Sequence, residues 1–322
     1  MCAASVFAPG RAHPSKYQAM LPNARLLPSL RLRARRAGLG GWVYLLPALA
    51  IYVWLVLGSL GTALQYSLYH WDGVGESEWA GFDNYLEVFR NDELLAAILH
   101  SFVLIGFYCV IPVSCGLVMA AVIHGGRQRS LGAWARTILF LPQLIPLVAS
   151  GIAWKWMFAT TGPVNQFLKA VGLGSITRAW LADYDLALPA VGLIGVWVLL
   201  GFCTVLLLTG MTRIDATLYE AARIDGAGPL REFFAVTLPG LRNQIAVCVT
   251  VTIILSMASF DIVFVATGGG PGTQTMVPGV QIYRRAFTYH EVGLASAYGI
   301  VLMALVLLLI LPIQRLSRTG DR

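Results

Sequence analysis

The chain has 322 residues, of which 57% are hydrophobic and 12% charged, and its mean hydropathy is +0.70. This composition excludes a soluble globular domain and predicts an integral membrane protein. The net charge of +7 does not indicate a nucleic-acid-binding protein, because the basic residues gather in separate segments between long apolar runs.

Residues 1–40 are predicted to form a disordered basic tail, which carries the cluster RLRARR at Arg31–Arg36. Each of these arginines is attracted to anionic lipid by about 1 kcal/mol, so membrane lipid is the expected partner. A secretory signal is rejected. The following apolar run, Trp42 to Tyr66, is longer than the roughly 7–15 residues of a signal core and has no small-residue cleavage site.

The rest of the chain, 41–322, is predicted to be one membrane domain, which makes the fold all-α and polytopic. A bilayer needs about 20 apolar residues per helix, and six runs satisfy this. Within them only Lys155 and Asp261 are charged. The six expected transmembrane helices cover about 42–66, 98–123, 137–158, 187–211, 244–266 and 293–314.

Charge sets the expected orientation. With the N-terminus in the cytoplasm, 17 of the 23 basic residues lie inside, while the first outer loop is acidic. The positive-inside rule therefore predicts cytoplasmic N- and C-termini. The outer loop after the third run is expected to hold a short helix at Val164–Val171. Thr267–Pro271 (TGGGP) is expected to form a tight outer turn.

The polar segment 212–243 contains YEAARIDGAG (Tyr219–Gly228) and predicts two helices beneath the membrane. Asp215 is the expected N-cap of the first helix, and Gly226 ends it where a positive φ is needed. Pro229 opens the second helix, which Pro239 is expected to stop. The apolar residues expected to face inward are Leu218, Ala221, Ala222 and Ile224 in the first helix and Phe233, Phe234 and Val236 in the second.

Two interpretations of this segment stay open on the residues alone. It packs on its own membrane domain, or it docks in the groove of a partner protein. Adjacent Ala221 and Ala222 permit close approach, and Glu220 and Asp225 supply carboxylates for a partner's arginines.

A set of ordered motifs favours docking. Glu220-Ala221-Ala222, followed by Gly226 and Leu238-Pro239, resembles the EAA signature of the membrane subunits of binding-protein-dependent ABC importers. Further motifs resemble the branch related to the maltose and glycerol-3-phosphate permeases, and the likeness covers nearly the whole chain from residue 42. They are GFDNY (Gly81–Tyr85), TILFLPQLIP (Thr137–Pro146), WLADYDLALPAV (Trp180–Val191), FDIVFVATGGGPGTQT (Phe260–Thr275) and IYRRAF (Ile282–Phe287).

The resemblance implies a permease subunit that forms half of a path for a sugar-type solute. Its partners would be a second homologous permease, a dimer of ATP-binding cassette ATPases and an extracytoplasmic solute-binding protein. The ATPase would dock on the 212–243 loop. The residues implied in coupling are Glu220, Ala221, Ala222, Asp225, Gly226, Ala227 and Pro239.

The positions of the lysines exclude one kind of ATP-binding loop. A Walker A loop needs Gly-Lys-Ser/Thr, and none of the three lysines follows a glycine. No ATP or other cofactor, no metal and no catalytic site is therefore expected in this chain, and ATP is used by a partner. A secondary transporter would need more ionisable residues in mid-membrane, and an enzyme would need paired catalytic groups. A scaffold is not excluded by single residues.

Four polar residues in the runs are candidates for the translocation pathway or its gate: Asp261, Gln143, Ser256 and Ser259. An intramembrane carboxylate is a functional candidate by default. For Asp261, near the outer end of the fifth run, a structural or gating role is favoured over contact with solute. Serines in membrane helices more often bond to backbone or to a neighbouring helix.

Overall fold

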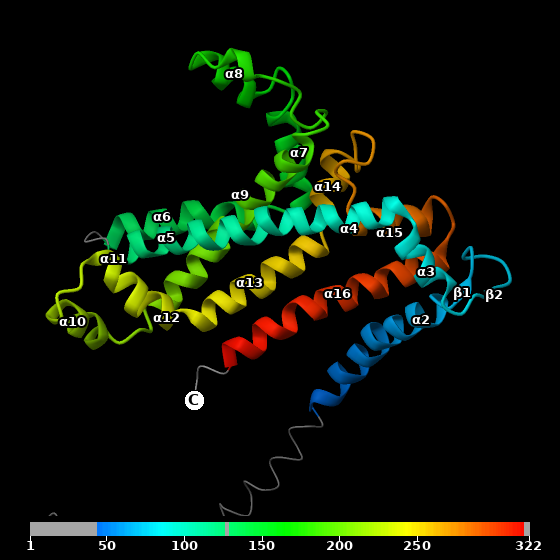
Figure 1. Ribbon diagram of the computed structural model, residues 1–322, viewed down its shortest axis with the longest axis horizontal. Helices are drawn as coiled ribbons and strands as arrows, with labels where there is room; N and C mark the ends of the chain where they lie inside the picture. Colours follow the sequence, from blue (N-terminus) through cyan, green and yellow to red (C-terminus); the bar gives the residue numbers. More distant parts are fainter. Residues whose placement is uncertain (1–43, 126–128, 319–322) are drawn as a thin grey trace, which may run out of the picture. The chain divides into compact units, whose positions relative to one another are not determined.

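The computed structural model describes residues 44–125 and 129–318 (Figure 1). The expected basic tail, 1–40, lies outside them. The chain divides into two compact units, Met1–Leu60 and Gly61–Arg322. In the first unit, residues 44–60 belong to a helix that runs over Tyr44–Tyr66 and includes the π-helical turn η1 (Val53–Leu57) and α2 (Gly58–Tyr66). This confirms the first predicted span.

The second unit contains a small subdomain after α2. Strands β1 (Tyr69–His70) and β2 (Glu78–Trp79) pair antiparallel, and α3 (Asp83–Arg90) follows. Strands of two residues are too short to show an alternation of apolar and polar side chains, so the sequence predicted only an acidic loop here.

The second span is one long helix, Asp92–Gly125, made of α4 (Asp92–Ile105), the π-helical turn η2 (Gly106–Val110) and α5 (Ile111–Gly125). It begins before the predicted residue 98 because the Asn91 side chain accepts hydrogen bonds from the amides of Glu93 and Leu94. The first turn of α4 is also packed against the rest of the protein, since Leu94 is fully buried.

The third span is sharply bent, whereas the sequence predicted a single run. It comprises α6 (Arg129–Phe140), the 3₁₀ turn η3 (Leu141–Leu144) and α7 (Leu147–Met157), and the two arms meet at 98°. Ile145, the residue before Pro146, has extended backbone angles, which is the conformation that a following proline favours. Next come α8 (Pro163–Ala170), which confirms the short helix expected after the third run, and η4 (Gly174–Ile176).

The fourth span is α9 (Ala187–Met211), as predicted. The fifth was predicted to be one helix over 244–266, and that is wrong. Helix α13 (Arg242–Met257) ends, residues 258–260 are not helical, and α14 (Asp261–Ala266) starts separately. The break lies against α15 (Pro278–Phe287), where a Cβ at Gly279 would be 2.8 Å from the carbonyl oxygen of Ser259.

Helix α16 (Val292–Arg318) completes the chain and confirms the sixth span. Four of the described helices are long and apolar enough to cross a membrane, and two bent helix pairs raise the number to as many as six. The second pair is Pro229–Gly240 with Arg242–Met257, bent by 69°. The fold is therefore an all-α membrane protein, and six spans agree with it.

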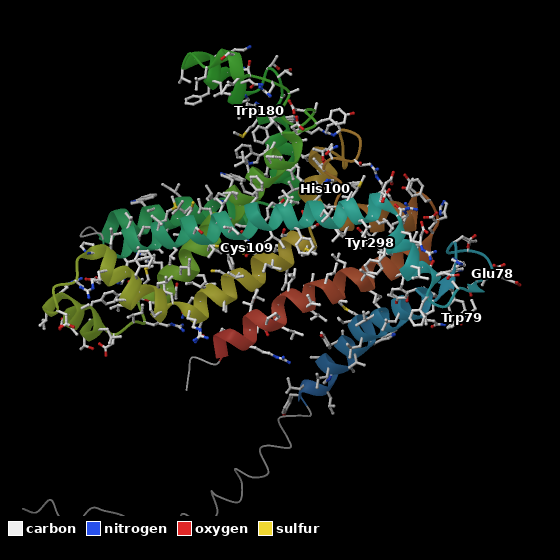
Figure 2. All side chains as sticks on the ribbon, in the orientation of Figure 1. Glu78, Trp79, His100, Cys109, Trp180 and Tyr298 are labelled. Carbon is white, nitrogen blue, oxygen red and sulfur yellow. The ribbon has the colours of Figure 1, made fainter. Side chains whose placement is uncertain are left out.

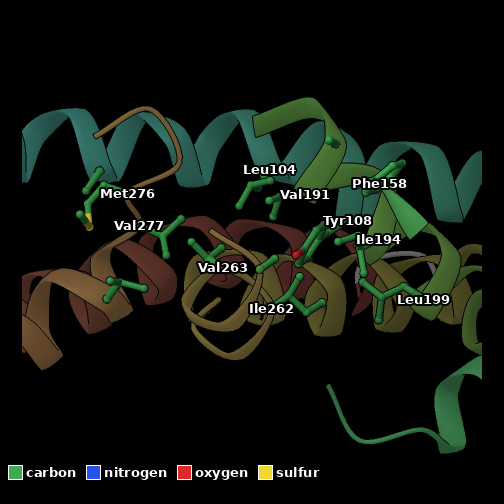
Figure 3. Packing of buried hydrophobic residues seen from close by; sticks show 14 residues of the cluster. Leu104, Tyr108, Phe158, Val191, Ile194, Leu199, Ile262, Val263, Met276 and Val277 are labelled. Carbon is green, nitrogen blue, oxygen red and sulfur yellow. The ribbon is translucent and has the colours of Figure 1, made fainter. Parts of the chain in front are cut away.

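Helix α9 is the centre of the packing in the second unit, and it contacts α5, α6 and α13. One core cluster joins α9 to Leu104, Tyr108, Ile262 and Met276, shown in Figure 3. Glycines allow the close approach: a Cβ at Gly195 would overlap the ring of Tyr108, and one at Gly201 would overlap the carbonyl of Leu139.

Two side chains tie long helices to segments far away in the sequence, and both are labelled in Figure 2. The Tyr298 hydroxyl donates to the carbonyl of Leu94 at 2.7 Å, linking α16 to α4. His100 Nδ1 lies 2.8 Å from the carbonyl oxygen of Met276, linking α4 to the loop before α15. These bonds hold α16 and the loop before α15 against α4.

Candidate coupling hairpin and membrane cavity

The segment between α9 and α13 folds as two helices joined by a tight turn. Helix α10 (Ala216–Ile224) starts at Asp215, whose carboxylate accepts from the amide of Thr217 at 3.0 Å. That hydrogen bond holds the pKa of Asp215 below its usual value. The predicted N-cap is therefore confirmed.

The turn after α10 is a Schellman motif. Gly226 has φ +77°, its amide donates to the carbonyl of Arg223, and the amide of Ala227 donates to the carbonyl of Ala222. Asp225 is the C-cap residue. Gly226 thus ends the helix as predicted.

The second helix consists of α11 (Pro229–Glu232), the π-helical turn η5 (Phe233–Thr237) and α12 (Leu238–Gly240). Pro229 occupies the first position, as expected. Pro239 does not stop the helix, which continues to Gly240. Phe234 was predicted to face inward, but it is 62% exposed, so that prediction is wrong. We call residues 215–240 the 215–240 hairpin.

Side-chain contacts hold the two helices of the 215–240 hairpin together. The guanidinium of Arg223 donates from Nε to Glu232 Oε2 at 2.9 Å and from its NH2 nitrogen to Oε1 at 3.2 Å. The hydroxyls of Tyr219 and Thr237 lie 3.2 Å apart. The Tyr219 ring also packs near that of His124, with 6.2 Å between ring centroids, which ties α10 to the end of α5.

The other surface of the 215–240 hairpin is open and apolar. Of the coupling residues, Glu220, Ala221, Asp225, Gly226 and Pro239 are exposed, whereas Ala222 and Ala227 are half-buried. The exposed large apolar side chains are Leu218, Ile224, Leu230 and Phe234, and the exposed fraction of Ile224 is 85%. The inward apolar stripe predicted for α10 is thus wrong for Leu218 and Ile224, which face outward.

A cavity of about 90 Å³ lies where the fifth span breaks. Its wall is apolar except for Tyr108, Ser259 and Asp261. The Tyr108 hydroxyl is buried close to Ser259, but its distance and angles satisfy no hydrogen bond within the described residues. Asp261 is the first residue of α14 instead of lying inside a continuous span. Sequence reasoning missed Tyr108, which reads as one more apolar residue of its run.

Two other pathway candidates lie away from this cavity. Ser256 is fully buried, and its hydroxyl donates to the carbonyl of Ser101 at 3.1 Å, so it joins α13 to α4. Gln143 lies in η3 at the bend of the third span, and its Oε1 atom is buried without a partner in the described part of the chain. The structure therefore brings together only Ser259 and Asp261 of the four predicted residues.

Known proteins resemble this chain over most of its length. Residues 113–319 match the family described as "Binding-protein-dependent transport system inner membrane component". The chain is 31% identical over 285 residues to "Probable ABC transporter permease protein YurN" of Bacillus subtilis, covering 87% of this chain and 96% of that protein. It is 32% identical over 290 residues to "Diacetylchitobiose uptake system permease protein NgcF" of Streptomyces coelicolor, covering 85% and 81%.

A solved structure shares the fold. A chain of a bacterial ABC transporter involved in the import of the acidic polysaccharide alginate superposes with a TM-score of 0.75 at 24% identity, covering 90% of this chain and 99% of that one. The family match and the two relatives, together with the membrane helices, lead to one conclusion: this chain belongs to the inner-membrane permease family of binding-protein-dependent ABC transport systems and is a membrane-spanning transport subunit, not an enzyme.

Proposed function

We propose that this permease forms half of the translocation path for a carbohydrate-type solute and is driven by a separate ABC ATPase that docks on the 215–240 hairpin. A second homologous permease completes the path, and an extracytoplasmic binding protein delivers the solute. Both termini face the cytoplasm, which places the hairpin on the ATPase side. The chain itself binds no cofactor, and its partner hydrolyses ATP.

The observation that carries the docking proposal is the open face of the 215–240 hairpin. Ile224, Leu230 and Phe234 expose most of their side chains on a loop, while polar contacts such as Arg223–Glu232 lie between its helices. Exposed large apolar side chains with carboxylates nearby are typical of a protein-binding surface. The exposed carboxylates are those of Glu220 and Asp225.

A carbohydrate-type solute is supported by the name of the relative NgcF and by the cavity. Hydroxyl groups set in an apolar wall suit a ligand that has hydroxyl groups and apolar faces. Ser259 and Tyr108 offer hydroxyls at the wall. For Asp261 we favour a structural or gating role at the start of α14. A change in the solute carried by Asp261→Asn, at normal protein level, would contradict that choice.

The test is reconstitution of the complete importer in proteoliposomes. We expect Leu230→Asp, which places a charge in the apolar face, to insert normally but to lose the ATPase during purification and to abolish uptake. Val74→Asp is the matched control, because Val74 is 93% exposed in the outer loop. Full ATPase recovery and uptake with Leu230→Asp would show that the ATPase docks elsewhere.

A further inference from the structure

Arg223 stands between two carboxylates of the 215–240 hairpin. Glu232, on the neighbouring helix, accepts two hydrogen bonds from the Arg223 guanidinium, at 2.9 and 3.2 Å. Glu220 precedes Arg223 by three residues on α10, a spacing at which side chains of a helix are neighbours. Yet Glu220 forms no hydrogen bond or ion pair within the described residues, although its charge helps to raise the pKa of Arg223 after the larger effect of Glu232.

The Arg223–Glu232 pair matters little for stability. The Arg223 side chain is 66% exposed, and ion pairs between exposed side chains contribute little to stability. The turn between the helices is already fixed by the backbone bonds around Gly226. The main effect of the ion pair is therefore to orient the Arg223 guanidinium toward Glu232.

Glu232 is well placed to hold it. Its side chain is 18% exposed, and its amide is bonded to the carbonyl of Gly228 in the first turn of α11. A bidentate guanidinium–carboxylate contact also fixes orientation, not only distance. Without Glu232, the neighbouring carboxylate on α10 open to Arg223 is that of Glu220.

We infer that Glu232 is a positioning residue that draws Arg223 away from Glu220 and so keeps the Glu220 carboxylate available for a cationic side chain of the ATPase. This inference rests on the proposed docking at the 215–240 hairpin. A freed Arg223 would neutralise Glu220 and would also bring a like charge to the approaching cation, which interfaces penalise strongly.

The test uses the assembled importer and four variants: Glu232→Gln, Arg223→Gln, the double variant and Glu220→Gln. The ATPase subunit, purified separately, is titrated onto the permease pair in proteoliposomes, and ATP hydrolysis is measured with solute-loaded binding protein. We expect Glu232→Gln to weaken the apparent affinity about tenfold and Arg223→Gln to change it less than about twofold. The double variant should behave like Arg223→Gln, because no guanidinium remains to cover Glu220.

Salt supplies a second readout that a purely structural role would not move. The defect of Glu232→Gln should shrink as ionic strength rises, since it comes from exposed charges. Equal losses in both single variants with no recovery in the double variant would overturn the inference, as would normal affinity in Glu232→Gln. Glu220→Gln distinguishes the failure of the docking role of Glu220 from the failure of the positioning role of Glu232. Normal ATPase affinity in Glu220→Gln would show that Glu220 has no docking role. A defect in Glu220→Gln alone would show that only the role assigned to Glu232 is wrong.

Discussion

The side-chain amide of Asn84 donates to the backbone carbonyl of Tyr69 at 2.9 Å and to that of Ser67 at the same distance. Asn84 is buried and belongs to GFDNY, whose Tyr85 hydroxyl lies 2.7 Å from that of Ser67. The motif therefore fastens α3 to the strand-bearing segment before it. These hydrogen bonds give the motif a structural role in this subdomain.

Replacing Asn84 by alanine should destabilise the subdomain of β1, β2 and α3 by about 2–3 kcal/mol, because two backbone carbonyls lose their donor in a buried place. Tyr85→Phe removes one hydrogen bond and should cost about 1 kcal/mol. Hydrogen exchange over residues 67–70 measures both. Equal protection in Asn84→Ala and in the wild type would contradict this role.

Glycine at position 201 should be required for the contact between α9 and the end of α6. An added Cβ would overlap the Leu139 carbonyl and come within 2.9 Å of the Phe140 Cα, and neither backbone atom can rotate away. We expect Gly201→Ala to destabilise the protein by about 1–3 kcal/mol through overpacking. The measurement is thermal unfolding in detergent.

The matched control is Gly106→Ala, in the long second span. A Cβ at Gly106 would meet no atom within 4 Å, and the residue has helical backbone angles. Alanine there should leave the protein unchanged or stabilise it by up to about 1 kcal/mol, since glycine weakens a helix. A similar loss in both variants would show that close packing at Gly201 is not the cause.

Sequence reasoning predicted the parts of the fold that depend on local signals. The apolar run 187–211 coincides with α9, and Asp215, Gly226 and Pro229 mark the helix ends of the 215–240 hairpin because capping needs only a few neighbouring residues. The breaks were harder. Pro146 lies at the bend of the third span, but a proline does not by itself set an angle of 98°, and residues 258–260 contain neither glycine nor proline.

In the candidate sites, too, local signals were predicted and tertiary contacts were not. The break before Asp261 depends on α15, which packs against it from further along the chain, so no local pattern could reveal it. The cavity joins Tyr108 from the second span to Ser259 and Asp261, and that meeting is set by tertiary packing. Ser256 looked equally suitable in sequence, but it faces α4 instead.

Gly226 should be required for its backbone conformation, not for its small size. Its φ is +77°, yet an added Cβ would meet no atom within 4 Å. We expect Gly226→Ala to destabilise the turn by about 1 kcal/mol, the cost of a left-handed conformation for an L-residue. Gly226→Trp should insert and express normally but abolish uptake, because a bulky side chain would also stand on the docking face.

Gly228 provides the control for this prediction. It is equally open but has φ −73°, which any residue adopts. Gly228→Ala should therefore leave stability unchanged. Normal uptake with Gly226→Trp would rule out a docking role for the turn, while a loss of stability in Gly228→Ala equal to that in Gly226→Ala would show that φ is not the cause.

The N-cap at Asp215 should set both the stability of α10 and its response to acid. Asp215→Ala removes the acceptor of the Thr217 amide and should cost about 1 kcal/mol, whereas Asp215→Asn, which keeps an acceptor oxygen, should cost less.

The pKa of the Asp215 carboxylate is lowered in the folded chain by the hydrogen bond from the Thr217 amide. Its contribution is therefore complete above the usual value of 3.8 and is lost as pH falls through the lowered pKa. Hydrogen exchange of the Thr217 and Leu218 amides checks this, and Asp215→Asn should show no such acid dependence. Loss of protection above pH 5 in the wild type would contradict the assignment.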